Sequence, residues 1–166
     1  MHVLLMVVAG LVIVFGFVVF FGAPYLPTMR RQTETALDML DLKKGQTLLE
    51  LGSGDGRFLL AAARRGIKSV GYELNPLLVI WTLLISWRYR KLVSVKWGNY
   101  WSVQWPPADG MYVFLLQKYM NKLDKKVMQY VKENGKCNLV SFAFTIPGKK
   151  PKAQKDGLSL YEYKQK

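Results

Sequence analysis

A glycine-rich segment, Glu50 to Gly56, constrains the fold of this chain more than any other feature of its sequence. It reads Glu-Leu-Gly-Ser-Gly-Asp-Gly and overlaps the end of the apolar run Thr47 to Leu51. This pattern predicts the end of a strand, a tight loop and the start of a helix. Glycine adopts positive φ and has no Cβ, so the backbone at Gly52, Gly54 and Gly56 can lie against a bound molecule, while N–H groups opening the helix face a negative group on it. We therefore expect a small, partly anionic ligand at this loop.

The spacing of the glycines separates this loop from the dinucleotide fingerprint. In that fingerprint the third glycine stands three positions after the second, a place that Arg57 occupies here. A second acid follows, because Ser69 to Glu73 reads as a strand ending in a carboxylate that can accept both hydrogen bonds from a ribose diol. Acid-x-Gly-x-Gly-x-Gly at a strand end resembles the first motif of the class I S-adenosylmethionine (SAM) methyltransferases, whose loop holds the methionine part of the cofactor. The alternatives are a glycine-rich turn without a ligand and an NAD site with irregular spacing.

Composition narrows the chemistry. The chain has 166 residues and a mass of 19.0 kDa, which is enough for one globular domain. Its single cysteine, Cys137, excludes an internal disulfide, and no Cys/His cluster suggests a metal site. The only histidine is His2, far from every motif, which argues against a histidine general base and against triad hydrolases.

The N-terminal segment predicts a membrane anchor. Val3 to Phe21 contains no charged residue, and a helix of that length at about 1.5 Å per residue crosses roughly 30 Å of hydrocarbon. A cleaved signal peptide is the alternative, but no Lys or Arg precedes the run and no small-residue cleavage site follows it. Arg30 and Arg31 are the first charges after the run, so the positive-inside rule predicts a catalytic domain in the cytoplasm or the mitochondrial matrix. We expect a single-pass anchor at residues 1–23 and a second domain at residues 24–166.

Beyond the anchor, helix and strand signals alternate, which predicts an α/β, Rossmann-like sheet of about six to seven mostly parallel strands. The expected strands are Thr47–Leu51, Ser69–Glu73, Val93–Trp97, Met111–Leu116, Asn138–Phe144 and Leu158–Tyr163. The expected helices are Thr28–Leu42, Arg57–Arg65, Pro76–Tyr89 and Asn121–Val131. The segment Thr145 to Asp156, rich in lysine with Pro147, Gly148 and Pro151, reads as a linker.

Ligands of such sheets bind outside the carboxyl ends of the strands. The loop after the third expected strand carries Asn99, whose amide oxygen can accept a hydrogen bond from an adenine amino group while Tyr100 or Trp101 packs on the purine. A polar turn capped by aromatic side chains explains the same residues equally well. Tyr119 follows the fourth expected strand, close to where a transferred methyl group would lie.

Three segments together resemble a more specific family. Pro24-Tyr25-Leu26-Pro27-Thr28 follows the apolar helix, Gly52-Ser53-Gly54-Asp55-Gly56-Arg57 forms the loop, and Gly71-Tyr72-Glu73-Leu74-Asn75-Pro76 follows it. This combination is similar to the membrane-anchored lysine methyltransferases related to the ATP synthase c-subunit lysine N-methyltransferase, and the likeness weakens after Trp101. The resemblance implies a lid of Tyr25, Pro27 and Thr28, contacts of Glu50, Gly52, Gly54 and Asp55 with the methionine moiety, and Glu73 on the ribose. Ser53, Gly56 and Asn99 are the other expected cofactor-binding residues. The family usually has an acid where Asn99 stands.

Methyl transfer to an amine is an in-line displacement, so positioning supplies much of the rate. The free pKa of lysine is about 10.4, and an aromatic channel that excludes water favours the neutral amine. We expect Tyr25, Tyr100, Trp101 and Tyr119 around that channel as catalytic residues, with packing in the core as the alternative for each.

Charge indicates partners. Lys and Arg number 24 against 11 Asp and Glu, a formal net charge of +13, which on an anchored protein fits attraction to anionic lipid. Nucleic-acid binding is the less favoured alternative. The helix Leu77 to Trp87 is apolar on nearly every face and is either buried or immersed in the bilayer interface. The resulting hypothesis is a protein-lysine methyltransferase acting on a membrane or membrane-proximal protein. Methylation of a lipid, a small amphiphile or RNA, and a non-enzymatic adaptor role on a membrane, are the alternatives.

Overall fold

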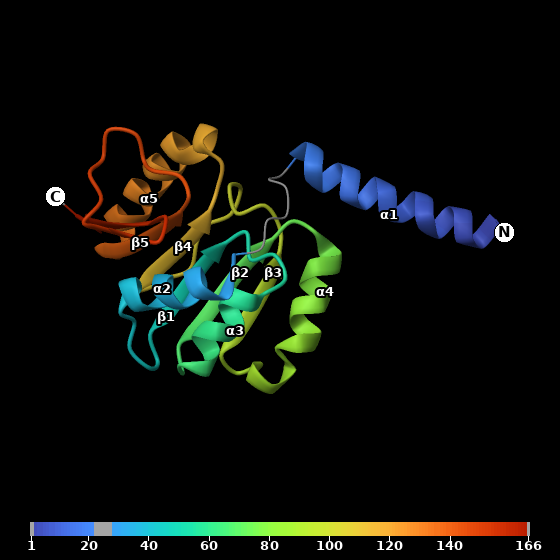
Figure 1. Cartoon of the computed structure of the whole chain (residues 1–166), viewed down its shortest axis with the longest axis horizontal. Coiled ribbons are helices and arrows are strands. Elements are labelled where there is room, and N and C mark those ends of the chain that lie inside the picture. Colours follow the sequence, from blue (N-terminus) through green and yellow to red (C-terminus); the bar gives the residue numbers. More distant parts are fainter. Residues whose placement is uncertain (1, 22–27, 166) are drawn as a thin grey trace.

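A seven-stranded sheet forms the centre of the chain, with helices on both faces (Figure 1). The computed structural model describes residues 2–21 and 28–165. The strands are β1 (Thr47–Leu51), β2 (Lys68–Glu73), β3 (Val93–Trp97), β4 (Gly110–Phe114), β5 (Lys136–Phe142), β6 (Ala153–Lys155) and β7 (Leu158–Lys164). The α-helices are α1 (His2–Phe21), α2 (Arg30–Leu40), α3 (Arg57–Arg64), α4 (Pro76–Ile85) and α5 (Met120–Asn134).

The order of the strands places a binding crevice at β1. The sheet runs β3-β2-β1-β4-β5-β7-β6, with β1 to β5 parallel and β7 antiparallel to both β5 and β6. The chain winds outward from β1 in one direction to β3 and then returns to β4 on the other side. Such a reversal leaves a crevice at the carboxyl ends of β1 and β4, where doubly wound sheets bind their ligands. The topology therefore directs attention to the loop that follows β1.

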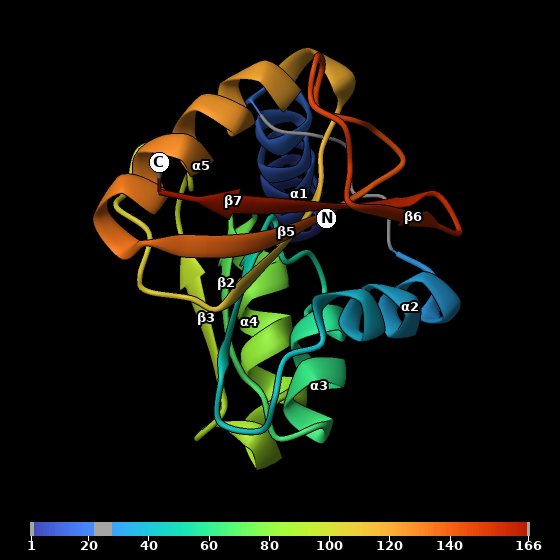
Figure 2. The ribbon, with the colours of Figure 1, turned by 90° about the vertical axis from the view of Figure 1, so that its left-hand side faces the viewer.

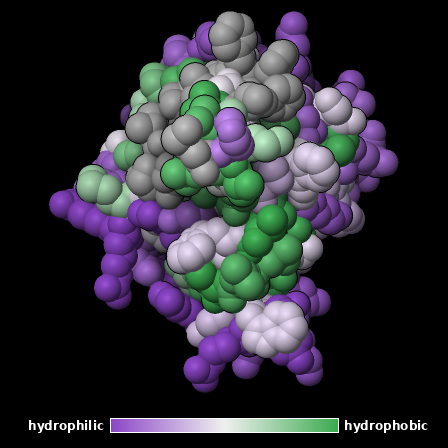
Figure 3. Space-filling model, turned by 90° about the vertical axis from the view of Figure 1, so that its right-hand side faces the viewer, coloured by the Kyte–Doolittle hydropathy of each residue, from purple (hydrophilic) through white to green (hydrophobic). Residues whose placement is uncertain are grey.

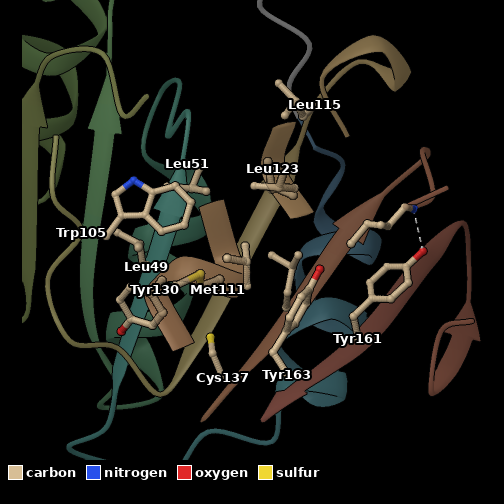
Figure 4. Close-up of a cluster of buried hydrophobic side chains, with 14 of the residues drawn as sticks. Leu49, Leu51, Trp105, Met111, Leu115, Leu123, Tyr130, Cys137, Tyr161 and Tyr163 are labelled. Carbon is tan, nitrogen blue, oxygen red and sulfur yellow. Dashed lines mark hydrogen bonds between the residues drawn. The ribbon is translucent and has the colours of Figure 1, made fainter. Parts of the chain in front are cut away.

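The two faces of the sheet have separate cores because side chains alternate along each strand. Figure 2 shows α2, α3 and α4 on one face and α5 on the other. Leu48 packs with Leu37 and Phe58 under α2 and α3, whereas Leu49 packs with Leu123 under α5. Figure 4 shows the second of these cores, in which aromatic rings and aliphatic side chains from β1, β4, β5 and β7 fill the space beneath α5. Both cores fix the strand ends that carry the loops.

The sequence predicted most of these elements, and the differences have local causes. The linker expected at residues 145–156 contains β6, whose three residues are all exposed and so lack the apolar alternation that marks a strand. Helix α4 ends at Ile85 and is followed by a 3-10 turn at Trp87–Tyr89, where one helix to Tyr89 was expected. The strand expected to reach Phe144 ends at Phe142, because Ala143 adopts a φ of 65°.

The N-terminal segment forms the expected helix, α1, and the expected transmembrane span is not found. Several of its apolar side chains are exposed, including Val3, Leu4 and Val12. Across residues 2–21 and 28–165, no helix has the length and apolar character that crossing a membrane requires.

Substitution of Gly71 in β2 tests how tightly this sheet packs against the glycine-rich loop. A Cβ at this position would lie 2.7 Å from both the Leu59 Cδ1 and the Ser53 Cβ. We expect Gly71→Ala to lower the free energy of unfolding by about 1–3 kcal/mol, because a well-packed interior must shift to admit a methyl group. Chemical denaturation followed by circular dichroism measures this. Gly10→Ala is the control, since its Cβ would meet no atom within 4 Å; equal stability of the two variants would contradict the packing argument.

Candidate active site

The glycine-rich loop turns sharply because three of its residues adopt positive φ. The φ angles of Gly52, Gly54 and Gly56 are 92°, 54° and 77°, values that residues with a Cβ rarely take. The Gly52 and Ser53 N–H groups both donate to the Tyr72 carbonyl, at 3.0 and 2.9 Å, so the loop is tied to the end of β2. The turn predicted from the glycine spacing is present.

The glycines of the loop differ in what surrounds them. A Cβ on Gly52 would meet no atom of the described residues within 4 Å, so among these residues this part of the backbone borders space that a ligand can enter. A Cβ on Gly56 would lie 2.4 Å from the Thr82 Cγ2, so glycine is needed there for α4 to approach. The Thr82 hydroxyl also donates to the Gly54 carbonyl at 3.4 Å. A ligand can therefore approach the backbone at Gly52 closely. Glycine at position 56 instead allows α4 to pack against the loop.

The carboxylate of Glu73 connects two loops. Glu73 ends β2 and is nearly buried. Its Oε2 accepts a hydrogen bond from the Gly54 N–H at 2.8 Å, and its Oε1 accepts one from the Asn75 N–H at 2.8 Å. A carboxylate has about four acceptor positions, so capacity remains for the hydroxyl groups of a ribose. The second acid predicted from the sequence thus lies directly beside the glycine-rich loop.

Glu50 and Ser53 present buried polar atoms that lack partners. Glu50 is 5% exposed, and neither its Oε2 nor the Ser53 Oγ has a hydrogen-bond partner among the described residues. Burial, followed by the charges of Asp55 and Glu73, raises the pKa of Glu50 well above its ordinary value. The Gln32 Oε1 of α2 is also buried and has no partner in the part of the chain that the structure describes. Buried polar atoms are normally satisfied, so these residues fit a site that receives hydrogen-bond donors from a polar ligand such as an amino acid moiety.

Asp55 is connected to the segment that follows the apolar helix. The Arg57 Nε donates to the Asp55 Oδ1 at 2.9 Å, and another guanidinium nitrogen donates to the Asp55 Oδ2 at 2.6 Å. The same guanidinium donates to the Thr28 carbonyl at 3.2 Å. The buried Thr28 hydroxyl lies 2.9 Å from the Tyr112 hydroxyl of β4. Thr28 therefore lies where the expected lid would meet the loop, whereas Tyr25 and Pro27 lie outside the described residues.

Arg57 and Tyr112 are site residues that the sequence analysis missed. Tyr112 stacks on Phe58 with ring centroids 3.9 Å apart, and burial is the main cause that raises its pKa. Arg57 could have been suspected, because it stands two residues after an acid in the same loop. No pattern in the sequence could have paired Tyr112 with Thr28, since 84 positions separate them.

Three of the four expected catalytic aromatic residues form one cluster at the ends of β3 and β4. The Trp101 ring centroid lies 4.9 Å from that of Tyr100 and 6.3 Å from that of Tyr119. All three side chains are half-buried and pack on the core beneath α5, as the packing alternative also required. Burial, then the neighbouring Tyr119 and Glu73, raises the pKa of Tyr100, so its hydroxyl is neutral at physiological pH.

Lysine ammonium groups already lie on these rings. The Lys122 Nζ lies 4.4 Å from the centroid of Trp101, and the Lys118 Nζ lies 4.9 Å from that of Tyr119. Aromatic faces attract such cations through the quadrupole of the ring. The faces of Trp101 and Tyr119 therefore bind ammonium groups, and the chain's own lysines occupy them in this structure.

Asn99 closes the turn that leads into this cluster. Its side chain is exposed, and its Oδ1 accepts a hydrogen bond from the Trp101 N–H at 3.0 Å. This arrangement matches the polar turn weighed as the alternative to adenine binding. The amide oxygen retains a second lone pair, so the adenine contact stays a prediction.

The comparisons with known proteins were consistent with this geometry. The family model described as the ANTKMT methyltransferase domain matches residues 50–153. The human ATP synthase c-subunit lysine N-methyltransferase is 32% identical over 123 residues, covering 73% of this chain and 52% of that protein. The mouse adenine nucleotide translocase lysine N-methyltransferase is 34% identical over 133 residues, covering 78% and 57%. The chain thus spans little more than half the length of these relatives.

A solved structure extends the comparison to the cofactor. An RNA methyltransferase from Salinibacter ruber in complex with S-adenosyl-L-homocysteine superposes with a TM-score of 0.72 and 25% identity, covering 84% of this chain and 93% of that one. S-adenosyl-L-homocysteine is what SAM becomes when its methyl group is lost. The class I fold and the SAM cofactor expected from the sequence are confirmed by these relationships. They leave the roles of individual residues as predictions.

The Glu50→Gln variant tests whether an ionised Glu50 destabilises the folded chain. The raised pKa means that the folded chain binds a proton at Glu50 more tightly than the unfolded chain does, so the contribution of Glu50 to stability declines as pH rises above the ordinary value of 4.5. We expect the glutamine variant, without ligand, to be more stable than the natural chain at neutral pH and similar to it below pH 4.5. Denaturation across this pH range measures the difference. The exposed Glu162, whose pKa is lowered by Lys164 and Lys152, is the control; a gain in stability for Glu162→Gln would contradict the explanation.

Glu73→Ala tests the ribose contact. We expect the affinity for SAM to fall by about 1.5–3 kcal/mol, the range for hydrogen bonds to a charged group. Calorimetric titration measures the affinity, and Glu162→Ala serves as a control for loss of a surface carboxylate. An unchanged affinity in a folded Glu73→Ala variant would exclude Glu73 from the ribose site.

Proposed function

Because the chain belongs to the family of the ANTKMT methyltransferase domain, we propose that it is a SAM-dependent protein-lysine N-methyltransferase acting on a membrane or membrane-proximal protein. The relatives named for lysine methylation support this proposal. The main observation behind the proposal is the aromatic cluster of Tyr100, Trp101 and Tyr119, which lies near Glu73 at the end of β2.

The cofactor pocket in this proposal is built around the ends of β1 and β2. Glu50 and Ser53 accept or exchange hydrogen bonds with the amino acid part of SAM, Gly52 and Gly54 allow its backbone contact, and Glu73 holds the ribose. SAM supplies a methyl group on a positively charged sulfur. The pKa of the buried Glu50 is raised by burial and then by the charges of Asp55 and Glu73, and a cation bound beside these residues would reduce the repulsion between them. The remaining proposed contacts are Tyr25, Pro27, Thr28, Gly56 and Asn99.

The acceptor site in this proposal is the aromatic cluster. A substrate lysine enters beside the rings of Trp101 and Tyr119, displaces the Lys122 and Lys118 ammonium groups that lie over them, and is separated there from bulk water. Removal from water lowers the pKa of an amine, so the neutral form that attacks the methyl group becomes more populated. The rings then hold the amine in line with the methyl group, which is where positioning contributes to the rate. Tyr25 is proposed as a fourth wall of this channel.

Attachment to a membrane is the second part of the proposal. Helix α1 exposes a series of apolar side chains, and Arg30 and Arg31 are the first charges after it. The net charge of +13 favours an anionic surface. We propose that α1 anchors the domain to a membrane through these side chains, and that Arg30 and Arg31 contact anionic lipid. An enzyme held in this way meets membrane-proximal lysines at a high effective concentration.

Labelled SAM identifies the acceptor. The purified full-length chain is incubated with labelled SAM and a membrane extract, and we expect acid hydrolysis of the labelled product to yield methylated lysine. Label recovered in lipid or in RNA, the acceptor type of the Salinibacter ruber relative, would contradict the lysine assignment. Trp101→Ala should lower turnover while leaving SAM affinity nearly unchanged, because the ring contacts the acceptor in this proposal.

Removal of residues 1–23 tests the attachment. We expect the affinity for SAM to be nearly intact while methylation of the membrane substrate falls sharply, because tethering adds effective concentration without adding contacts in the pocket. Methylation of a detergent-solubilised substrate is the control and should be retained. Recovery of the full-length chain in the soluble fraction after carbonate extraction would contradict the anchor.

A further inference from the structure

Helix α4 has the opposite polarity to that of an ordinary helix on a sheet. A surface helix normally buries an apolar stripe and exposes its polar residues. In α4 and the residue that caps it, the buried positions are Val79, Thr82 and Ser86, two of which carry hydroxyl groups. The exposed large apolar side chains on the helix are Leu77, Ile80, Trp81, Leu83, Leu84 and Ile85. We refer to these six residues, together with Trp87 in the following turn, as the α4 face.

The polar inward side of α4 has a structural reason. Thr82 has no exposed surface, lies against Gly56 and donates to the Gly54 carbonyl. A larger apolar residue would collide with the glycine-rich loop. The inward side of α4 therefore packs against the glycine-rich loop. The apolar residues on its outward side pack into no core in the part of the chain that the structure describes.

The α4 face is a single convex patch. Leu84 and Trp87 are 68% and 66% exposed. Figure 3 shows a continuous apolar patch over α4, with hydrophilic residues beside and below it. A convex apolar surface does not enclose a peptide as a groove does, but it can sink into a plane of lipid. Sequence reasoning left open whether this helix is buried or interfacial, and its exposure excludes burial within the described domain.

Positive charge adjoins the patch. Arg88, Arg90 and Lys91 follow α4 directly and are exposed, and the Arg90 guanidinium lies 5.0 Å from the centroid of the Trp87 ring. No Asp or Glu occurs between Glu73 and Asp109. The whole segment that contains α4 and β3 thus carries positive charge only, which complements the phosphates of an anionic membrane.

We propose that the α4 face lies in the interfacial layer of an anionic lipid bilayer, with Arg88, Arg90 and Lys91 contacting lipid phosphates. Amphipathic helices bind membranes in this way, with an apolar side among the acyl chains and basic residues at the headgroups, and tryptophan favours the same depth. This deepens the membrane attachment proposed above and rests on it for its setting. It adds a second point of contact, made by the globular domain itself.

A second contact would orient the domain. Helix α4 begins three residues after Glu73, and the strand beside it, β3, is followed by the turn that carries Tyr100 and Trp101. Contact through α4 therefore brings the β3 edge of the sheet toward the bilayer, whereas Tyr100, Trp101 and Tyr119 pack on the core of the other face, beneath α5.

A polarity-sensitive fluorophore on an engineered cysteine tests the contact. The full-length chain carries the label at Leu84→Cys in the α4 face or, as the control, at Met128→Cys, an exposed apolar position on α5. The natural Cys137 is buried and its pKa is raised to about 12, so it stays unlabelled. In vesicles of phosphatidylcholine and phosphatidylserine made with brominated acyl chains, we expect several-fold stronger quenching and a blue-shifted emission at position 84 only. Equal, weak quenching at both positions would overturn the proposal.

Charge reversal separates the lipid contact from pairing between two copies of the chain. Arg88→Glu with Arg90→Glu should reduce the quenching at position 84 several-fold, while Lys125→Glu with Lys132→Glu, which makes the same change of charge on exposed residues of α5, should not. Quenching that both pairs leave unchanged would overturn the phosphate contact. Shielding of position 84 that rises with protein concentration and is insensitive to brominated lipid would overturn the lipid contact and mean that α4 pairs with a second copy. None of these readouts involves methyl transfer, so failure of the lipid contact is distinguishable from failure of the enzymatic proposal.

Discussion

The carboxylate of Glu73 is the interaction on which the rest of the candidate site depends. A loop with three glycines has many accessible conformations when unfolded, and ordering it is unfavourable in entropy. Glu73 offsets this by accepting hydrogen bonds from the Gly54 and Asn75 N–H groups, which joins the loop after β1 to the loop after β2. Charge-assisted bonds of this kind are stronger than those between neutral groups. The shape of the loop is thus set before any ligand arrives.

The same arrangement concentrates negative charge. Glu50, Asp55 and Glu73 lie close enough together that the second and third raise the pKa of the first. A protein that needed only stability would not bury a carboxyl group one oxygen of which has no partner among the described residues, since apolar residues would serve the core better. Functional sites commonly hold strain or unsatisfied polar groups that the rest of the fold must support. The firm packing of β1 between β2 and β4 provides that support.

The sequence predicted those parts of the fold whose signals are local. The glycine spacing predicted the loop, and apolar runs ending in an acid predicted β1 and β2, because strand, turn and helix start lie within a few residues. Contacts between distant segments left no such trace. The bond between Thr28 and Tyr112 and the contact of Thr82 with Gly56 arise only when the sheet assembles. Strand β6 was not predicted because an exposed edge strand needs no apolar pattern. Tyr100, Trp101 and Tyr119 were expected near the acceptor, but nothing in the sequence indicated that they contact one another.

The position of Thr82 means that one short helix borders two different environments. On its inner side α4 contacts the carbonyl of Gly54, and on its outer side it exposes its apolar residues. A ligand that restricts the motion of the glycine-rich loop also restricts α4, because Thr82 of α4 contacts that loop. A partner bound to the outer face restricts the same helix. Thermodynamic linkage requires such an effect to be reciprocal. If cofactor binding changes the affinity of the outer face for its partner by some factor, a partner on that face changes the affinity for the cofactor by the same factor. The affinity of the domain for its cofactor therefore depends on what contacts α4.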